Sequence, residues 1–293
     1  MCGSPPAVAV AALIFGCAIF AMSGSGLLFA AAPAKVLDLD AAPVGGVTRV
    51  FGSTGTGVYG VPTAGGHDCD GDGLRDFAFA QIVADPMGRT DAGQVTLIFG
   101  DGTIGTDIDT GNPSADILEI LGTHTREIAG NEIWIDDVDG DGLGDLLIGR
   151  QNFTVNYGQI DEGARSAGAL TIIFGDSDLR TLGTLDLASP PAGVAILTLV
   201  GASDYDRLGI WMRTGDIDGD GVNDIAVGAD EVDESGGSLS DNSGALYVVR
   251  GGSHLLALPA LIDLADLGNT ALAGNIALIH PPAGSAKFHF GAT

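Results

Sequence analysis

Three copies of one acidic nine-residue segment constrain the fold of this chain more than any other feature of its sequence. They span Asp68–Asp76, Asp137–Asp145 and Asp216–Asp224, and each carries Asp at positions 1, 3, 5 and 9 and Gly at positions 4 and 6. Self-similarity at intervals of roughly 70 to 80 residues indicates a chain built from repeated structural units rather than from one continuous fold.

Each nonapeptide is followed at once by a short apolar run, and after a loop of variable length by a second run that opens with Gly. The first runs are Phe77–Ala80, Leu146–Gly149 and Ile225–Gly228, and the second are Gly93–Gly100, Gly168–Gly175 and Gly244–Gly251. Their length and β-branched content are typical of buried strands. The acidic segments therefore connect strands, not helices.

A further glycine marks the chain upstream of each nonapeptide. It occurs in Tyr59-Gly60, Ala129-Gly130 and Leu208-Gly209, and the same signal returns near the end of the chain as Phe290-Gly291. We therefore expect three complete repeats and the start of a fourth.

The composition fits a folded β-protein and argues against one class of partner. Hydrophobic residues make up 45% of the 293 residues, which is enough for a core, and the 47 glycines suit many tight turns. Acidic residues outnumber basic ones by 38 to 12, giving a formal net charge of -26. A nucleic-acid partner needs a basic face to release counterions, so the sequence predicts no nucleic-acid binding.

The nonapeptide, the strand after it and the Gly-initiated second strand, three times in the same order, resemble the FG-GAP repeat of the integrin α-subunit β-propeller and its bacterial relatives. The resemblance covers about residues 45–293 and implies an all-β fold of β-propeller blades. The expected repeats are 47–117, 118–196, 197–278 and a partial 279–293. Such propellers have about seven blades, so three blades and the start of a fourth form an incomplete ring. We expect a truncated fragment; assembly from several chains is the alternative.

The acidic segments are predicted to bind calcium at about three sites. Carboxylates confined in one short loop repel each other, at about 1 kcal/mol per pair at ~4 Å even in water. Calcium accepts six to eight oxygen ligands in flexible geometry, whereas zinc prefers His or Cys. An EF-hand is excluded, because its position 12 needs Glu and is here Phe79, Ile148 or Val227.

The predicted ligands are the aspartate side chains of each segment and the backbone carbonyl at its position 7: Asp68, Asp70, Asp72, Leu74 and Asp76; Asp137, Asp139, Asp141, Leu143 and Asp145; and Asp216, Asp218, Asp220, Val222 and Asp224.

The amino terminus predicts export. No charged side chain precedes Lys35, and residues 1–34 are expected to form a signal peptide or a membrane anchor. The triplet Ala32-Pro33-Ala34 favours cleavage there, while a lipoprotein signal ending at Cys17 fits less well. Cleavage would leave Cys69 as the one cysteine of a propeller segment spanning residues 35–293, secreted or at the cell surface.

No catalytic motif accompanies these features. The sequence holds no H-E-x-x-H, no G-x-S-x-G and no Walker lysine, so we expect no enzyme activity. The resemblance implies an adhesion or ligand-binding module that meets a protein or glycan through loops opposite the metal-binding hairpins, with membrane contact only through an uncleaved amino terminus. Two alternatives remain open: a non-catalytic propeller within a secreted hydrolase or polysaccharide-cleaving enzyme, and a structural surface protein.

Overall fold

The computed structural model describes residues 50–51, 59–103, 108–110, 116–154, 167–233, 242–266, 272–282 and 289–291. The expected leader, residues 1–34, lies outside this part of the chain. The chain divides into two compact units, Met1–Ser53 with Thr103–Asn112, and Thr54–Gly102 with Pro113–Thr293. Among the described residues, no helix is long and apolar enough to cross a membrane.

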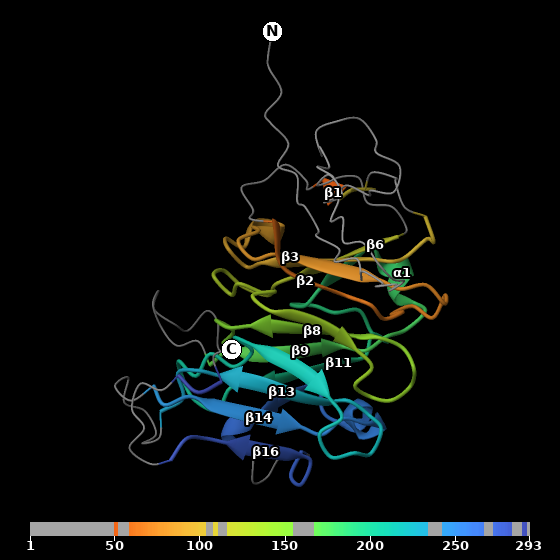
Figure 1. Cartoon of the computed structure of the whole chain (residues 1–293). Helices are drawn as coiled ribbons and strands as arrows, with labels where there is room; N and C mark the ends of the chain where they lie inside the picture. The colour runs from red at the N-terminus through yellow and green to blue at the C-terminus, as the bar shows by residue number, and fades with distance from the viewer. Residues whose placement is uncertain are drawn as a thin grey trace, which may run out of the picture. The chain divides into compact units, whose positions relative to one another are not determined.

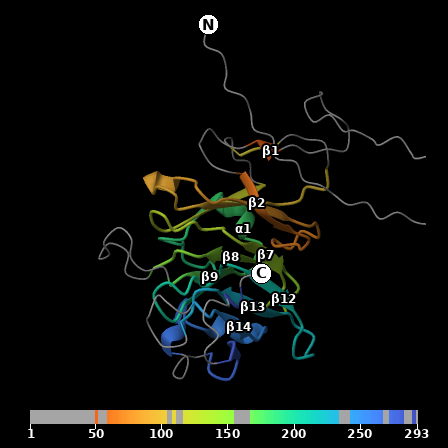
Figure 2. The ribbon, with the colours of Figure 1, turned by 60° about the vertical axis from the view of Figure 1, so that its left-hand side comes forward.

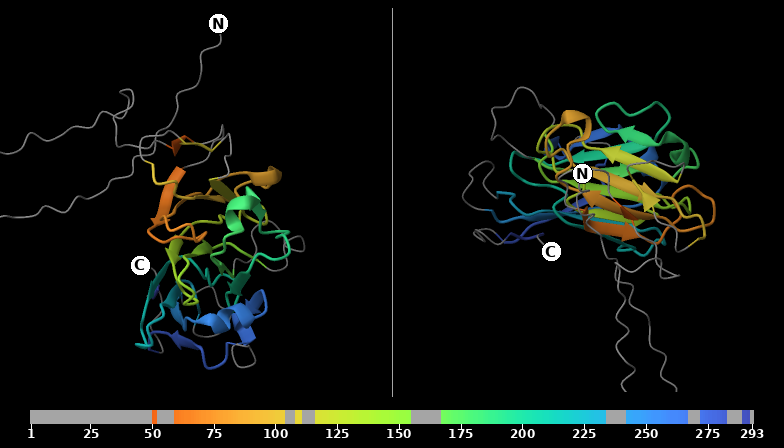
Figure 3. Two further views of the ribbon diagram at one scale, coloured as in Figure 1. Left: turned by 90° about the vertical axis from the view of Figure 1, so that its right-hand side faces the viewer. Right: turned by 90° about the horizontal axis from the view of Figure 1, so that it is seen from above.

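In the first unit, β1 (Val50–Phe51) pairs in parallel with β5 (Ile108–Asp109). The second unit contains three sheets that lie one above another (Figure 1). The same order of layers is seen when the second unit is turned about the vertical axis (Figure 2 and the left view of Figure 3). The prediction of an all-β fold is confirmed, and the sheets do not close into a ring within the described residues.

Each of the three sheets contains one acidic nonapeptide, between its edge strand and the next strand. The first sheet has the order β10-β6-β4-β3-β2, the second β15-β11-β9-β8-β7 and the third β12-β13-β14-β16. Their bounds are β2 Tyr59–Gly65, β3 Phe77–Gln81, β4 Gln94–Ile98, β6 Ile117–Leu121, β7 Ile133–Asp136, β8 Asp145–Arg150, β9 Ala169–Ile173, β10 Thr184–Asp186, β11 Ile196–Val200, β12 Met212–Gly215, β13 Asp224–Ala229, β14 Ala245–Val249, β15 Leu261–Asp263 and β16 Ile276–Ile279. Helical turns are short: η1 Pro86–Gly88, α1 Leu179–Leu182, η2 Ser253–Ala257 and η3 Leu264–Asp266.

Each of the first two sheets gains a strand from the following repeat. In the sequence, strand β10 lies between β9 and β11 of the second sheet, but it pairs in parallel with β6 of the first sheet. Strand β15 follows β14 of the third sheet in the sequence, but it pairs in parallel with β11 of the second sheet. The other pairs within these sheets are antiparallel. Successive repeats are therefore joined by backbone hydrogen bonds as well as by packing.

The middle sheet buries both of its faces. All six residues of β8 are buried, and successive residues alternate between two clusters, because neighbouring side chains of a strand point to opposite faces. Leu146 and Ile148 pack into the cluster shared with the first sheet, whereas Leu147 packs into the cluster shared with the third. This arrangement explains why the strands read as nearly continuous apolar runs.

The repeat glycines mark where one repeat touches the next. A Cβ on Gly149 would lie 2.1 Å from the carbonyl oxygen of Gly209, and one on Gly228 would lie 2.0 Å from that of Gly291. Gly209 and Gly291 also have positive φ angles, of 85° and 89°. Gly291, from the expected start of a fourth repeat, thus repeats the contact that Gly209 makes one repeat earlier.

Candidate metal centres

Three equivalent loops connect the first and second strands of the three sheets. We call Asp68–Asp76 loop 1, Asp137–Asp145 loop 2 and Asp216–Asp224 loop 3; they join β2 to β3, β7 to β8 and β12 to β13. The glycines at positions 4 and 6 have positive φ in all three loops, for example 83° at Gly140 and 94° at Gly142. Such angles are disfavoured for residues with a Cβ, so these glycines allow the tight curl.

The first aspartate of each loop accepts hydrogen bonds from both glycines. In loop 1, the backbone N–H groups of Gly71 and Gly73 each donate to the Asp68 carboxylate at 2.7 Å. The aspartates at positions 3 and 5 accept from the N–H two residues further on, as Asp139 does from Asp141 at 3.0 Å. The same bonds recur in the other loops.

The last aspartate anchors the loop to its own sheet. Asp145 is fully buried, and its carboxylate accepts 2.9 Å hydrogen bonds from the N–H groups of Val138 and Gly175. Asp76 and Asp224 accept from the equivalent groups in their repeats. This residue therefore fixes the loop as well as offering oxygen atoms to its interior.

The structure brings together the aspartates of positions 1, 3 and 9. In each loop, one carboxylate oxygen from each of the three lies within 4.8 Å of the other two: Asp68, Asp70 and Asp76; Asp137, Asp139 and Asp145; Asp216, Asp218 and Asp224. The aspartates of position 5, Asp72, Asp141 and Asp220, are not members of these groups. All-oxygen donor sets of this kind fit calcium, which tolerates irregular geometry, better than zinc.

Burial disfavours the charged form of several of these carboxylates when no cation is bound. Burial raises the pKa of Asp145 to about 7, with Asp139 and Asp141 adding like-charge repulsion and the N–H groups of Gly175 and Val138 opposing the shift. Burial likewise raises the pKa of Asp139. At Asp68 burial acts in the same direction, but hydrogen bonds from Gly73 and Gly71 outweigh it and the pKa is lowered. A divalent cation would favour the charged form of all these groups.

The same contact recurs between loops 1 and 2 and between loops 2 and 3. A Cβ on Gly71 of loop 1 would lie 3.4 Å from Leu143 Cδ2 of loop 2, and one on Gly140 of loop 2 would lie 3.2 Å from Val222 Cγ2 of loop 3. The residue at position 7 of one loop thus covers the position-4 glycine of the preceding loop. The three loops consequently form one row at the same end of the sheets.

Cys69, at position 2 of loop 1, is a buried free cysteine. Burial, together with the charge of Asp76, raises the pKa of its thiol. A raised pKa favours the protonated thiol over the reactive thiolate.

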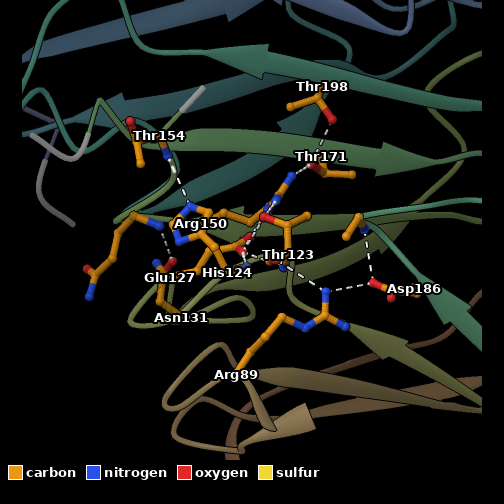
Figure 4. Close-up of polar contacts among 12 residues, drawn as sticks. Arg89, Thr123, His124, Glu127, Asn131, Arg150, Thr154, Thr171, Asp186 and Thr198 are labelled. Carbon is orange, nitrogen blue, oxygen red and sulfur yellow. Dashed lines mark hydrogen bonds and ion pairs between the residues drawn. The ribbon is translucent and has the colours of Figure 1, made fainter. Parts of the chain in front are cut away.

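A buried polar network at the other end of β8 gives no signal in the sequence (Figure 4). Its centre is the ion pair of Glu127 and Arg150, whose side chains are 0% and 3% exposed. The N–H groups of Thr123 and His124 donate to the other carboxylate oxygen of Glu127, at 2.5 and 2.9 Å. Burial acts to raise the pKa of Glu127, but Arg150 outweighs it and the pKa is lowered.

The network extends to strands β9 and β10 and to Arg89 of the first repeat. Arg150 Nη1 donates to Thr171 Oγ1 at 3.0 Å, and Arg89 Nη1 donates to the Thr123 carbonyl at 3.2 Å and to Asp186 Oδ1 at 2.9 Å (Figure 4). These contacts join residues that are far apart in the sequence, so no local motif announces them.

The network has no equivalent one repeat later. Asp206 is the residue of the third repeat that is equivalent to Glu127, and its carboxylate accepts a 2.8 Å hydrogen bond from the N–H of Ser203. Ala229 replaces Arg150, so the strand supplies no cation. Burial therefore raises the pKa of Asp206 to about 7, with the charges of Asp233 and Asp204 adding to the shift.

Repeated sheets that pack face to face and carry acidic hairpins are features of β-propeller blades. Residues 209–249 match the family model of the FG-GAP repeat. The matched segment contains β12, loop 3, β13 and β14, so the chain contains an FG-GAP repeat, as the sequence predicted. No curated protein matches the chain at a significant level. FG-GAP repeats occur in integrin-like β-propeller modules that bind ligands, and they do not form a catalytic family.

Proposed function

We propose that this chain is an exported, calcium-stabilised β-propeller segment that binds a protein or glycan ligand without catalysis. The observation that carries the proposal is the recurrence of one carboxylate group, at positions 1, 3 and 9, in all three loops of the second unit. A single acidic turn is weak evidence for a ligand, but three groups at the same loop positions with the same backbone hydrogen bonds indicate a shared one. The FG-GAP match over loop 3 supports calcium as that ligand.

The loops suited to ligand contact lie at the end of the sheets opposite the acid loops. This end includes the segments that follow β3 and β8 and the segment between β6 and β7, and the Glu127–Arg150 network holds these together. The hydrogen bonds there are made within the chain and leave the exposed loop surfaces for a partner. Calcium at the other end would act by stabilising the hairpins from which these loops project.

Calcium binding is tested by calorimetric titration of the full chain, after metal removal, with CaCl2. We expect binding at about three sites, and loss of one of them in the Asp139→Asn variant, because position 3 contributes to the carboxylate group. Asp178→Asn is the matched control, since Asp178 is exposed and lies outside the loops. An unchanged stoichiometry in Asp139→Asn would count against the assignment.

Ligand binding is tested by applying the purified chain to a glycan array and to immobilised extracellular matrix proteins, with calcium and with chelator. We expect calcium-dependent binding to one ligand class. Turnover of a bound glycan would contradict the non-catalytic assignment, and absence of any binding would favour a purely structural role.

A further inference from the structure

An arginine from the second repeat reaches back to loop 1 of the first. Arg180, in α1, places Nε 2.5 Å from Asp70 Oδ2 and Nη2 2.8 Å from Asp72 Oδ2. Its Nη2 also donates to the Gly100 carbonyl at 3.0 Å, and the guanidinium lies 5.3 Å from the ring centroid of Phe99. The Asp70 side chain is only 3% exposed, so this cation neutralises a buried charge.

A second arginine meets loop 3 in the same way from a different place in the sequence. Arg250, directly after β14 of the third repeat, places Nε 2.8 Å from Asp218 Oδ2 and Nη2 2.7 Å from Asp220 Oδ2. The same two guanidinium nitrogens therefore contact positions 3 and 5 in both loops. Arg180 and Arg250 do not occupy equivalent positions, so simple repetition of the sequence does not account for the shared geometry.

Loop 2 has neither arginine. The residue equivalent to Arg180 in the next repeat is Leu256, and the residue equivalent to Arg250 in the second repeat is Phe174. Within the described residues, no arginine forms an ion pair with a carboxylate of Asp137, Asp139, Asp141 or Asp145. Loop 2 is also the loop with the most deeply buried final aspartate.

We propose that Arg180 and Arg250 are built-in counter-ions that compete with calcium at loops 1 and 3, so that calcium fills loop 2 first. The inference rests on the calcium binding proposed above. A guanidinium on the carboxylate of position 3 shares an acceptor with the incoming ion and repels it. At separations of a few ångströms this repulsion weakens calcium binding by a factor of about ten in Kd.

The order of filling is tested by calorimetric titration of the full chain with CaCl2 at low ionic strength. We expect one tight site and two weaker sites in the unmodified protein. Asp139→Asn should remove the tight site, whereas Asp70→Asn and Asp218→Asn should each remove a weaker one. Three sites of equal affinity, or a tight site lost with Asp70 or Asp218, would overturn the inference while leaving calcium binding intact.

The role of the arginines is tested by measuring both calcium affinity and the Tm of the chelated protein; removal of an arginine should raise the first and lower the second. Arg250→Ala should tighten the loop 3 site about tenfold and should lower the Tm of the chelated protein, because its carboxylates lose their counter-ion. An arginine that only braces the fold would lower the Tm without tightening calcium. Arg213→Ala is the matched control, since Arg213 is similarly exposed and pairs with Glu132 outside the loops.

Arg180→Ala should act in the same way on loop 1, and Arg180→Lys keeps the charge if the alanine variant does not fold. Calcium affinities unchanged by both Arg250→Ala and the Arg180 variants would refute the competition. A complete absence of binding heat in the unmodified protein would refute the proposed calcium function together with this inference, so the two failures are distinguishable.

Discussion

Two buried carboxylates at equivalent positions, Glu127 and Asp206, show how strongly one nearby cation affects the pKa of a buried acid. Glu127 is paired with Arg150, whereas the Asp206 carboxylate accepts hydrogen bonds from backbone N–H groups and lies near Asp233 and Asp204. Both are almost fully buried, with exposures of 0% and 2%. The same structural position therefore stabilises one repeat junction through a charge pair and leaves the next with a carboxylate that favours its neutral form.

Loss of the cation at the first of these positions should be costly. Arg150→Ala leaves Glu127 buried and uncompensated, and we expect unfolding free energy to fall by about 3–5 kcal/mol. Urea unfolding provides the measurement. Asp178→Asn, which replaces an exposed carboxylate, should cost no more than about 1 kcal/mol. Equal losses in the two variants would show that burial of Glu127 does not govern the effect.

Asp206 predicts a pH-dependent stability of definite sign. Its pKa rises from 3.8 in the unfolded chain to about 7 in the fold, so the folded protein holds this proton more tightly. The resulting stabilisation is complete below the unfolded pKa and is lost as pH rises toward about 7. The asparagine of the Asp206→Asn variant does not titrate. As pH rises through this range, the unfolding free energy of the variant should therefore increase by up to about 4 kcal/mol relative to that of the unmodified protein.

This gain is measured as the difference in urea midpoint between the two proteins at several pH values, with chelator present. Asp178→Asn, which replaces an exposed carboxylate, is the matched control. A difference for Asp206→Asn that stayed constant from acid to neutral pH would contradict the raised pKa.

At the scale of elements, the sequence predicts the strands well and the connections between repeats poorly. The apolar runs after loops 1 to 3 form β3, β8 and β13, and the Gly-initiated runs form β4, β9 and β14, because each strand carries at least three buried side chains. Strands β10 and β15 have three residues and one buried side chain each. Their parallel pairing depends on the neighbouring repeat, which no local pattern reports.

In loops 1 to 3, as in the strands, features encoded by nearby residues could be predicted from the sequence, whereas contacts with distant residues could not. The aspartates of positions 1, 3 and 9 lie together because the glycine-dependent curl is encoded within nine residues. Position 5 lies outside that group, and in loop 1 Asp72 pairs with Arg180 from more than 100 residues away. Contacts of that kind require knowledge of how the sheets stack.

The repeat glycines give a prediction about the contact between elements. Gly209→Ala would combine a positive φ with a Cβ only 2.3 Å from the Ala169 carbonyl oxygen, and we expect a loss of at least about 3 kcal/mol in unfolding free energy. Gly193→Ala has the positive φ but nothing within 4 Å, so it should lose about 1–2 kcal/mol. Similar losses in the two variants would refute the close approach as the cause.

At the scale of the whole molecule, the net charge of -26 opposes folding, and much of that charge is concentrated in three loops. Two mechanisms could relieve it. Salt screens all exposed charges over a Debye length of about 10 Å at 0.1 M, whereas a bound calcium acts only at its loop. The two mechanisms therefore separate when ionic strength is held constant.

We expect millimolar CaCl2 to raise the Tm of the chelated protein far more than NaCl of equal ionic strength does. Each site filled at 100 times its Kd contributes about 2.7 kcal/mol to the unfolding free energy. Differential scanning calorimetry of the full chain under both conditions, with MgCl2 as a third, provides the measurement. If NaCl matched the effect of calcium, the loops would be screened acidic turns rather than metal sites. In 0.1 M NaCl, repulsion between charges spread over the surface is already screened. A rise in Tm on adding calcium under that condition therefore requires carboxylates that the fold holds close together in the loops.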